Sequence, residues 1–78
     1  MISVAIIGCG KVGSTLAYSL LQRTKLDMLL LFDKVENLAE GLALDLSHAF
    51  PHYANKIKAV KLKDVAADII VIAAGKGR

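Results

Sequence analysis

A glycine-rich segment near the amino terminus constrains the fold of this chain more than any other feature of the sequence. Residues 8–13 read GCGKVG, between a β-branched apolar run at residues 1–7 and residues 14–23, whose apolar side chains recur at helical spacing. In the pattern G-x-G-x-x-G, the first glycine permits a tight turn, the second lets a ligand approach the backbone, and the third lets the helix pack closely on the sheet. A helix that begins there offers unpaired N–H groups to a phosphate.

The segment therefore predicts a turn that binds the pyrophosphate of a dinucleotide. We expect hydroxyl donors from Ser14 and Thr15 as well, and backbone N–H donors from Lys11 and Val12. The expected binding residues of the turn are Gly8, Cys9, Gly10, Lys11, Val12 and Gly13. Cys9 itself is interpreted as an unreactive small residue. The alternative, a glycine turn that binds no ligand, is disfavoured because the segment lies between a strand and a helix.

The rest of the chain alternates between apolar runs and helical patterns. Apolar runs at residues 26–32 and 68–74 predict strands, and residues 36–50 predict a second helix that Pro51 ends. A weak alternation at residues 55–62 predicts a short strand, followed at residues 63–67 by a helical turn or a loop. This order predicts an α/β fold with a parallel sheet and crossover helices, a partial Rossmann fold. Because the strands are apolar at successive positions, we expect both faces of the sheet to be covered.

Composition excludes several classes of protein. No apolar run approaches the ~20 residues of a membrane helix, and the single cysteine excludes a disulfide framework or a multi-cysteine zinc site. The net charge of +3 is scattered and there is no Trp, which argues against nucleic-acid binding. Residues 6–9 read IIGC and match the cleavage site of a lipoprotein signal, but no basic residue and no long apolar segment precede them. We expect a cytoplasmic protein. A hydrophobic fraction of 55% is high for 78 residues and indicates either an oligomer or a piece of a longer chain.

Asp33 follows the second apolar run, 20 residues after Gly13. An acid at this spacing is typical of the residue that binds the ribose hydroxyls of NAD, and its charge repels the 2′-phosphate of NADP. The neighbouring Lys34 weakens that repulsion. The alternative is an exposed acid that begins a turn or caps the next helix.

The predicted helix at residues 36–50 has a broader apolar face than one sheet contact requires. We expect it to pack on its own sheet and on a second subunit, with close approach at Ala39, Gly41 and Ala43; the alternative is burial within one subunit. Asp45 and His48 form a possible pair at helical spacing. Neither His48 nor His52 is expected to be catalytic, because both lie away from the carboxyl ends of the strands.

Four blocks of the sequence resemble the amino-terminal part of the malate/lactate dehydrogenase family. VAIIGCGKVGSTLA resembles its dinucleotide turn and first helix, and LLLFD its second strand and ribose-binding acid. AEGLALDLSHA resembles its second helix and is the most specific block, while DIIVIAAGKGR is similar to its fourth strand and the following A-G-x-x-R segment. The resemblance extends over essentially the whole chain.

The resemblance implies an NAD-dependent oxidoreductase acting on a 2-hydroxy acid. Arg78 occupies the position where arginine implies a dicarboxylate and glutamine implies lactate, so malate and oxaloacetate are expected. The family's catalytic residues come later in its sequence, so residues 1–78 are expected to be a fragment, the first half of a doubly wound dinucleotide-binding domain. A lactate dehydrogenase and a nucleotide-sensing regulatory domain of potassium transport remain as alternatives.

Overall fold

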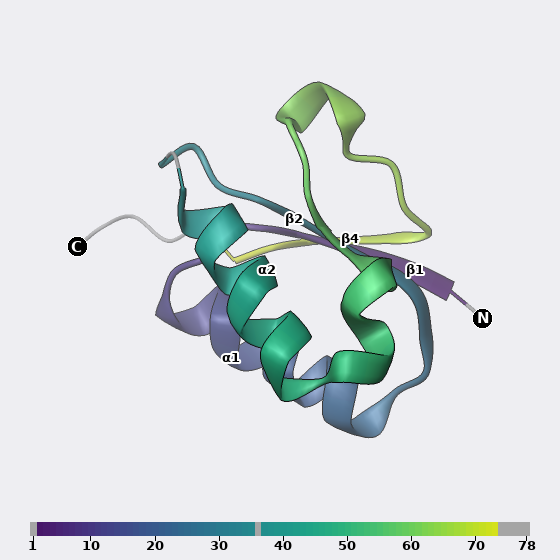
Figure 1. Ribbon diagram of the computed structural model, residues 1–78. Coiled ribbons are helices and arrows are strands. Elements are labelled where there is room, and N and C mark those ends of the chain that lie inside the picture. Colours follow the sequence, from purple (N-terminus) through teal and green to yellow (C-terminus); the bar gives the residue numbers. More distant parts are fainter. Residues whose placement is uncertain (1, 36, 74–78) are drawn as a thin grey trace.

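The computed structural model describes residues 2–35 and 37–73. Figure 1 shows a sheet seen nearly edge-on, with two helices beneath it and one long connection above it. The elements in chain order are β1 (Ile2–Ile7), α1 (Lys11–Arg23), β2 (Leu26–Phe32), α2 (Leu38–Ala49), the 3-10 helix η1 (Pro51–Lys56), β3 (Ile57–Ala59), the 3-10 helix η2 (Leu62–Asp64) and β4 (Ile69–Ile72). Among the described residues, no helix combines the length and apolarity that crossing a membrane requires.

The four strands form one parallel sheet in the order β3-β2-β1-β4. Ile7, at the carboxyl end of β1, pairs with Phe32 of β2 on one side and Ile72 of β4 on the other. The chain adds strands outward from β1 to β3 and then returns to place β4 beside β1. In open α/β sheets, ligands bind at such a reversal, outside the carboxyl ends of the strands. The prediction of an α/β fold with a parallel sheet and crossover helices is confirmed.

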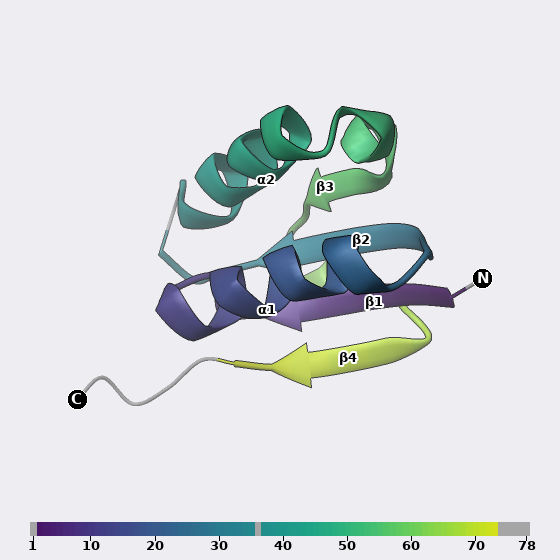
Figure 2. The same cartoon turned by 90° about the horizontal axis from the view of Figure 1, so that it is seen from below.

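Both α-helices cover the same face of the sheet, as Figure 2 shows from below. The crossovers from β1 to β2 and from β2 to β3 add strands in the same direction, and right-handed crossovers then place their helices on one side. The core lies between this face and the helices. Its most deeply buried members are Ile6, Ala17, Leu26, Leu29, Leu31 and Leu46.

The opposite face meets only in part the expectation that both faces would be covered, because Ala5 and Leu30 are buried there while part of β4 is exposed. Ile6 and Val71 are paired and face the core, so the alternation of a strand turns Ile70 and Ile72 to the other side. Their side chains are 49% and 72% exposed. Among the described residues, the connection from β3 to β4 crosses this side (Figure 1), and it contains a 3-10 turn in place of a helix.

Two helix boundaries differ from the sequence-based prediction. α1 begins at Lys11 and not at residue 14, because Gly10 serves as the N-cap and the end of the glycine motif forms the first helical turn. α2 begins at Leu38, after Asn37 with φ of 78°, and residue 36 lies outside the described residues. After Phe50, Pro51 begins η1 in place of a further α-helical turn.

The third strand is shorter than the alternation at residues 55–62 predicted. Residues 55 and 56 belong to η1, and the strand pairs with β2 only through Ile57, Lys58 and Ala59. The chain then leaves the sheet, and the predicted helical turn is η2 at Leu62–Asp64. β4 spans Ile69–Ile72, inside the predicted residues 68–74.

Candidate functional site at the glycine turn

The glycine turn connects the carboxyl end of β1 to the start of α1. Gly8 has a φ of 108°, a conformation that L side chains rarely adopt. Its N–H donates to the carbonyl oxygen of Phe32 at 2.8 Å, which joins the turn to the end of β2. Gly8 therefore lets the chain leave the sheet sharply while it remains attached to the neighbouring strand.

The other two glycines of the motif differ in what surrounds them. A Cβ at Gly13 would lie 1.8 Å from the carbonyl oxygen of Gly8, so the first turn of α1 packs directly on the glycine turn. A Cβ at Gly10 would have no atom within 4 Å. Gly13 is thus required by the protein's own packing, whereas Gly10 leaves the backbone open to an approaching ligand.

The amino terminus of α1 is available to an anion. The first N–H in the helix's hydrogen-bond ladder is that of Ser14, which donates to the carbonyl oxygen of Gly10 at 2.8 Å. The N–H groups of Lys11, Val12 and Gly13 precede this ladder. No side chain caps the helix and its first turn contains no acidic residue, so no residue of α1 itself neutralises the positive end of the helix dipole.

The hydroxyls of Ser14 and Thr15 are not donors to the space above the turn, which corrects the prediction made for them. Ser14 Oγ lies 2.9 Å from the carbonyl oxygen of Gly10, and Thr15 Oγ1 lies 2.8 Å from that of Lys11. Serine and threonine hydroxyls in helices commonly donate to a carbonyl one turn earlier. The structure therefore assigns both hydroxyls to the helix backbone.

Asp33 lies at the same edge, directly after β2. Its Oδ2 accepts a hydrogen bond from the Cys9 N–H at 2.7 Å, and its Oδ1 accepts one from the Val35 N–H at 2.8 Å. A carboxylate offers about four lone-pair positions, so acceptor capacity remains for further donors such as ribose hydroxyls. The structure thus brings Asp33 into direct contact with the glycine turn.

Cys9 is buried in the turn, with Sγ 3.5 Å from the carbonyl oxygen of Phe32. Burial, and secondarily the negative charge of Asp33, raises the pKa of the Cys9 thiol to about 11. The thiol is therefore protonated at neutral pH, in agreement with its interpretation as an unreactive residue of the turn.

We expect iodoacetamide to leave Cys9 unmodified in the folded protein at pH 8, because the thiolate is the reacting species. The folded state holds this proton more tightly than the unfolded chain, whose thiol ionises near pH ~8.5. The resulting contribution to stability is present below that pH and is lost as the pH rises through 11. Mass spectrometry after alkylation with and without urea measures the difference; rapid modification without urea would contradict the expectation.

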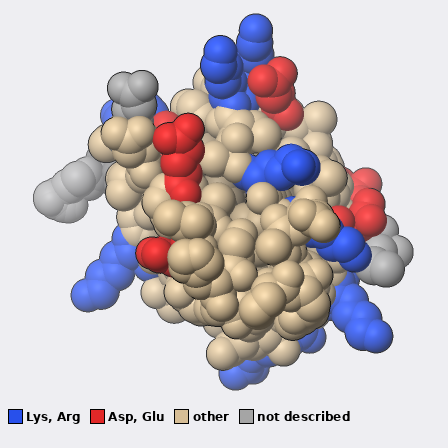
Figure 3. Space-filling view, viewed as in Figure 1, with Lys and Arg blue, Asp and Glu red and all other residues tan. Residues whose placement is uncertain are grey.

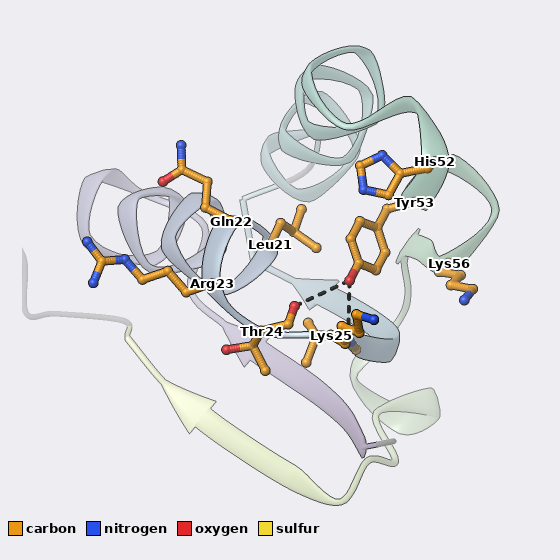
Figure 4. Close-up of a pocket in the computed structure, with 9 residues that line it drawn as sticks. Leu21, Gln22, Arg23, Thr24, Lys25, His52, Tyr53 and Lys56 are labelled. Carbon is orange, nitrogen blue, oxygen red and sulfur yellow. Dashed lines mark hydrogen bonds between the residues drawn. The ribbon is translucent and has the colours of Figure 1, made fainter.

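A cavity of about 450 Å³ lies at the other end of the sheet and does not coincide with the glycine turn (Figure 4). Its floor includes Tyr53, whose hydroxyl donates to the carbonyl oxygen of Thr24 and accepts from the N–H of Leu26, both at 3.3 Å.

His52 also lines this cavity, and His48 is exposed in the last turn of α2. Neither histidine approaches the glycine turn, as the sequence indicated. The lining residues are Leu21, Gln22, Arg23, Thr24, Lys25, Leu26, His52, Tyr53 and Lys56.

Substituting Tyr53→Phe is expected to lower the free energy of unfolding by about 1–3 kcal/mol, because the buried N–H of Leu26 loses its acceptor. Urea denaturation measures the change. Tyr18→Phe is the control, since the Tyr18 hydroxyl forms no hydrogen bond among the described residues and its side chain is 36% exposed. Equal stability of the two variants would show that the Tyr53 hydroxyl does not anchor η1.

A parallel sheet with these three features defines a class of protein: a glycine turn, an open helix start and an acid after the next strand are typical of dinucleotide-binding domains. Residues 2–78 match the family described as lactate/malate dehydrogenase, NAD binding domain. The chain therefore belongs to the lactate/malate dehydrogenase family, as part of its NAD-binding domain. This result confirms the resemblance seen in the sequence and favours it over a nucleotide-sensing regulatory domain.

Similar proteins carry both names of the family. Malate dehydrogenase of Sulfolobus acidocaldarius is 35% identical over 82 residues, which cover 100% of this chain and 27% of the relative. L-lactate dehydrogenase 2 of Lactobacillus johnsonii is 42% identical over 77 residues, covering 96% of this chain and 25% of the relative. The chain thus spans about a quarter of the length of these relatives.

Solved structures of dehydrogenases share the fold. Malate dehydrogenase from Plasmodium falciparum has a TM-score of 0.80 at 35% identity, over 100% of this chain and 26% of that one. Quinate dehydrogenase from Corynebacterium glutamicum in complex with NAD also has a TM-score of 0.80, at 27% identity over 92% of this chain and 26% of that one. The expected NAD cofactor agrees with the family and with this complex.

Sequence reasoning missed two parts of the arrangement, and one further prediction falls on a residue that the structure does not describe. It did not identify the backbone N–H of Cys9 as a partner of Asp33, because a backbone donor leaves no signature in the sequence. The Val35 partner was detectable, since aspartate commonly accepts from the N–H two residues on. Arg78, predicted to bind substrate, lies outside the described residues.

Proposed function

We propose that this chain is the first half of the NAD-binding domain of an NAD-dependent malate dehydrogenase. The observation that carries the proposal is the contact between an open glycine turn and Asp33 in a member of this family. In this proposal, Asp33 accepts hydrogen bonds from ribose hydroxyls and disfavours the 2′-phosphate of NADP. The pyrophosphate lies at the glycine turn and accepts from the N–H groups of Lys11, Val12 and Gly13. The N–H groups of Gly8 and Cys9 already donate to Phe32 and Asp33 and shape the turn.

The chain's own residues fit the cofactor in two respects. The vacant space beside Gly10 allows a diphosphate to reach the backbone, and the helix start of α1 supplies N–H donors and a favourable dipole. The bound nicotinamide supplies the hydride acceptor or donor for C2 of the substrate. Binding and orienting the cofactor is therefore the task we assign to these residues.

Malate is proposed as the substrate on the sequence position of Arg78. A guanidinium binds a second carboxylate in a bidentate pair, which a neutral amide cannot do. The alternative substrate is lactate, which the 42% identity to a lactate dehydrogenase supports.

Turnover by the full-length protein tests the proposal. Oxaloacetate and pyruvate are each assayed with NADH and with NADPH. We expect the highest kcat/KM with oxaloacetate and NADH. A preference for pyruvate would overturn the substrate assignment, and a preference for NADPH would overturn the role given to Asp33.

We also propose that α2 contributes to a homo-oligomer. Leu42 and Leu46 are buried on the sheet, whereas Leu38 and Leu44 are 40% and 58% exposed. Figure 3 shows a wide uncharged area over α2 and η1, with charged side chains mainly around it. Ala39 is buried within the chain and is therefore not available for close approach to a partner; Gly41 is exposed.

Leu44→Glu is expected to shift the protein from oligomer to monomer, because it places a charge in a desolvated interface. Analytical ultracentrifugation measures the mass. Leu62→Glu is the matched control, since Leu62 in η2 is also 58% exposed and lies away from α2. An unchanged mass for Leu44→Glu, or a monomeric unsubstituted protein, would contradict the proposed interface.

A further inference from the structure

We infer that Asp33 is also a positioning residue, which holds the glycine turn in its open conformation before a nucleotide binds. This role comes in addition to the ribose contact and rests on the proposed function for its relevance to NAD. One carboxylate then has two tasks: it shapes the phosphate site and binds the sugar.

Three contacts connect the turn to the end of β2. The Gly8 N–H donates to the Phe32 carbonyl oxygen at 2.8 Å, the Cys9 N–H donates to Asp33 Oδ2 at 2.7 Å, and the Cys9 thiol lies 3.5 Å from the Phe32 oxygen. The contact to Asp33 is the shortest of the three. It has an ionised acceptor, and such hydrogen bonds are roughly twice as strong as neutral ones.

The carboxylate of Asp33 is itself held in place. Its second oxygen accepts from the Val35 N–H at 2.8 Å, so a rotation of the side chain away from the turn would break two hydrogen bonds. Beyond Cys9, the Gly10 carbonyl oxygen accepts hydrogen bonds from the N–H and Oγ of Ser14, and these connect the turn to α1 and not to β2. The position of the turn relative to β2 therefore depends on Asp33 together with the hydrogen bond from Gly8 to Phe32.

The positioning role and a ribose contact predict different effects of an Asp33 substitution on the binding of an anion that contains no sugar. Removing a negative charge beside a phosphate site should leave unchanged, or strengthen, the binding of an anion without a sugar. If Asp33 holds the turn, the same substitution weakens that binding because the N–H donors are no longer arranged for it. Inorganic pyrophosphate is the probe, since it contains no ribose.

The experiment compares Asp33→Asn with Asp68→Asn in the full chain. Asp68 is the matched control: its Oδ2 accepts from the Ser3 N–H at 2.8 Å and also joins two parallel strands, at a site distant from the turn. In nucleotide-free protein, we expect the Cys9 amide to exchange roughly tenfold faster in Asp33→Asn and at an unchanged rate in Asp68→Asn. Pyrophosphate binding should weaken several-fold only in Asp33→Asn.

Unchanged Cys9 exchange, or tighter pyrophosphate binding in Asp33→Asn, would overturn the inference. A separate measurement needs no substitution and covers the case in which a variant does not fold. In the unsubstituted protein, a scalar coupling across the hydrogen bond should connect the Cys9 amide nitrogen to the Asp33 carboxyl carbon, and its absence would also overturn the inference. Failure of the unsubstituted protein to bind NADH would instead refute the proposed function, while the exchange result would still test the role of Asp33.

Discussion

Gly13→Ala is expected to lower the free energy of unfolding by about 3 kcal/mol or more, the upper range for overpacking a buried site. The added Cβ would lie 1.8 Å from the Gly8 carbonyl oxygen and 2.9 Å from its carbonyl carbon. Both are backbone atoms of a turn that is already fixed by its hydrogen bond to β2, so they cannot move aside as the end of a flexible side chain would. Relief requires α1 to move away from β1, which opens the core around Ala17 and Leu21.

Urea denaturation of the variant measures this loss, and Gly41→Ala is the matched control. Gly41 lies in α2, is exposed, and a Cβ there would contact nothing within 4 Å. Because glycine in a helix interior is less favourable than alanine, the control should stabilise the protein by about 0.5–1 kcal/mol. Similar stability for the two variants would show that the close packing of Gly13 on Gly8 is not essential.

Gly10→Val has the largest expected effect on NADH binding, a loss of roughly 100-fold, or about 2.7 kcal/mol. Its side chain would enter the vacant space through which we propose that the pyrophosphate reaches the backbone. Gly10 has φ of −77° and ψ of −155°, which other residues adopt without strain. The free energy of unfolding should therefore change by only about 1 kcal/mol, the cost of a poorer N-cap.

Fluorescence titration with NADH, combined with urea denaturation, separates the two glycine variants. Gly13→Ala should lose both stability and binding, and Gly10→Val should lose binding alone. NADH affinity close to that of the unsubstituted protein in Gly10→Val would mean that the nucleotide does not pass over the turn, and would remove the main support for the proposed site.

The sequence-based prediction was most accurate for features that depend on short segments of the chain, and less accurate for features that depend on pairing or backbone conformation. β1, β2 and β4 were predicted near their observed positions because continuous apolar runs identify buried strands. β3 was overestimated because its length depends on where η1 ends and on how many residues pair with β2. The start of α1 was placed three residues late. Gly10 is the N-cap because of its backbone conformation, and a glycine in the sequence does not by itself indicate an N-cap.

The candidate site shows the same division. The three glycines and Asp33 were identifiable from residue type and spacing. The hydroxyls of Ser14 and Thr15 were misassigned because their hydrogen bonds to Gly10 and Lys11 depend on rotamers. The exposure of Ile70 and Ile72 was not foreseen. An apolar run predicts a strand but does not show whether other segments cover both of its faces.

By itself, the sequence determined the order of strands and helices, the glycine turn and the dehydrogenase family, because periodicity and the stereochemistry of glycine are properties of short segments. Only the tertiary structure decided that both helices share one face, that Tyr53 anchors the opposite end of the sheet, and that the Asp33 carboxylate receives the Cys9 N–H. These features depend on strand pairing, which brings residues 24 positions apart to within 2.7 Å. Contacts of that kind follow from the packing of the whole sheet and are not encoded in any one segment.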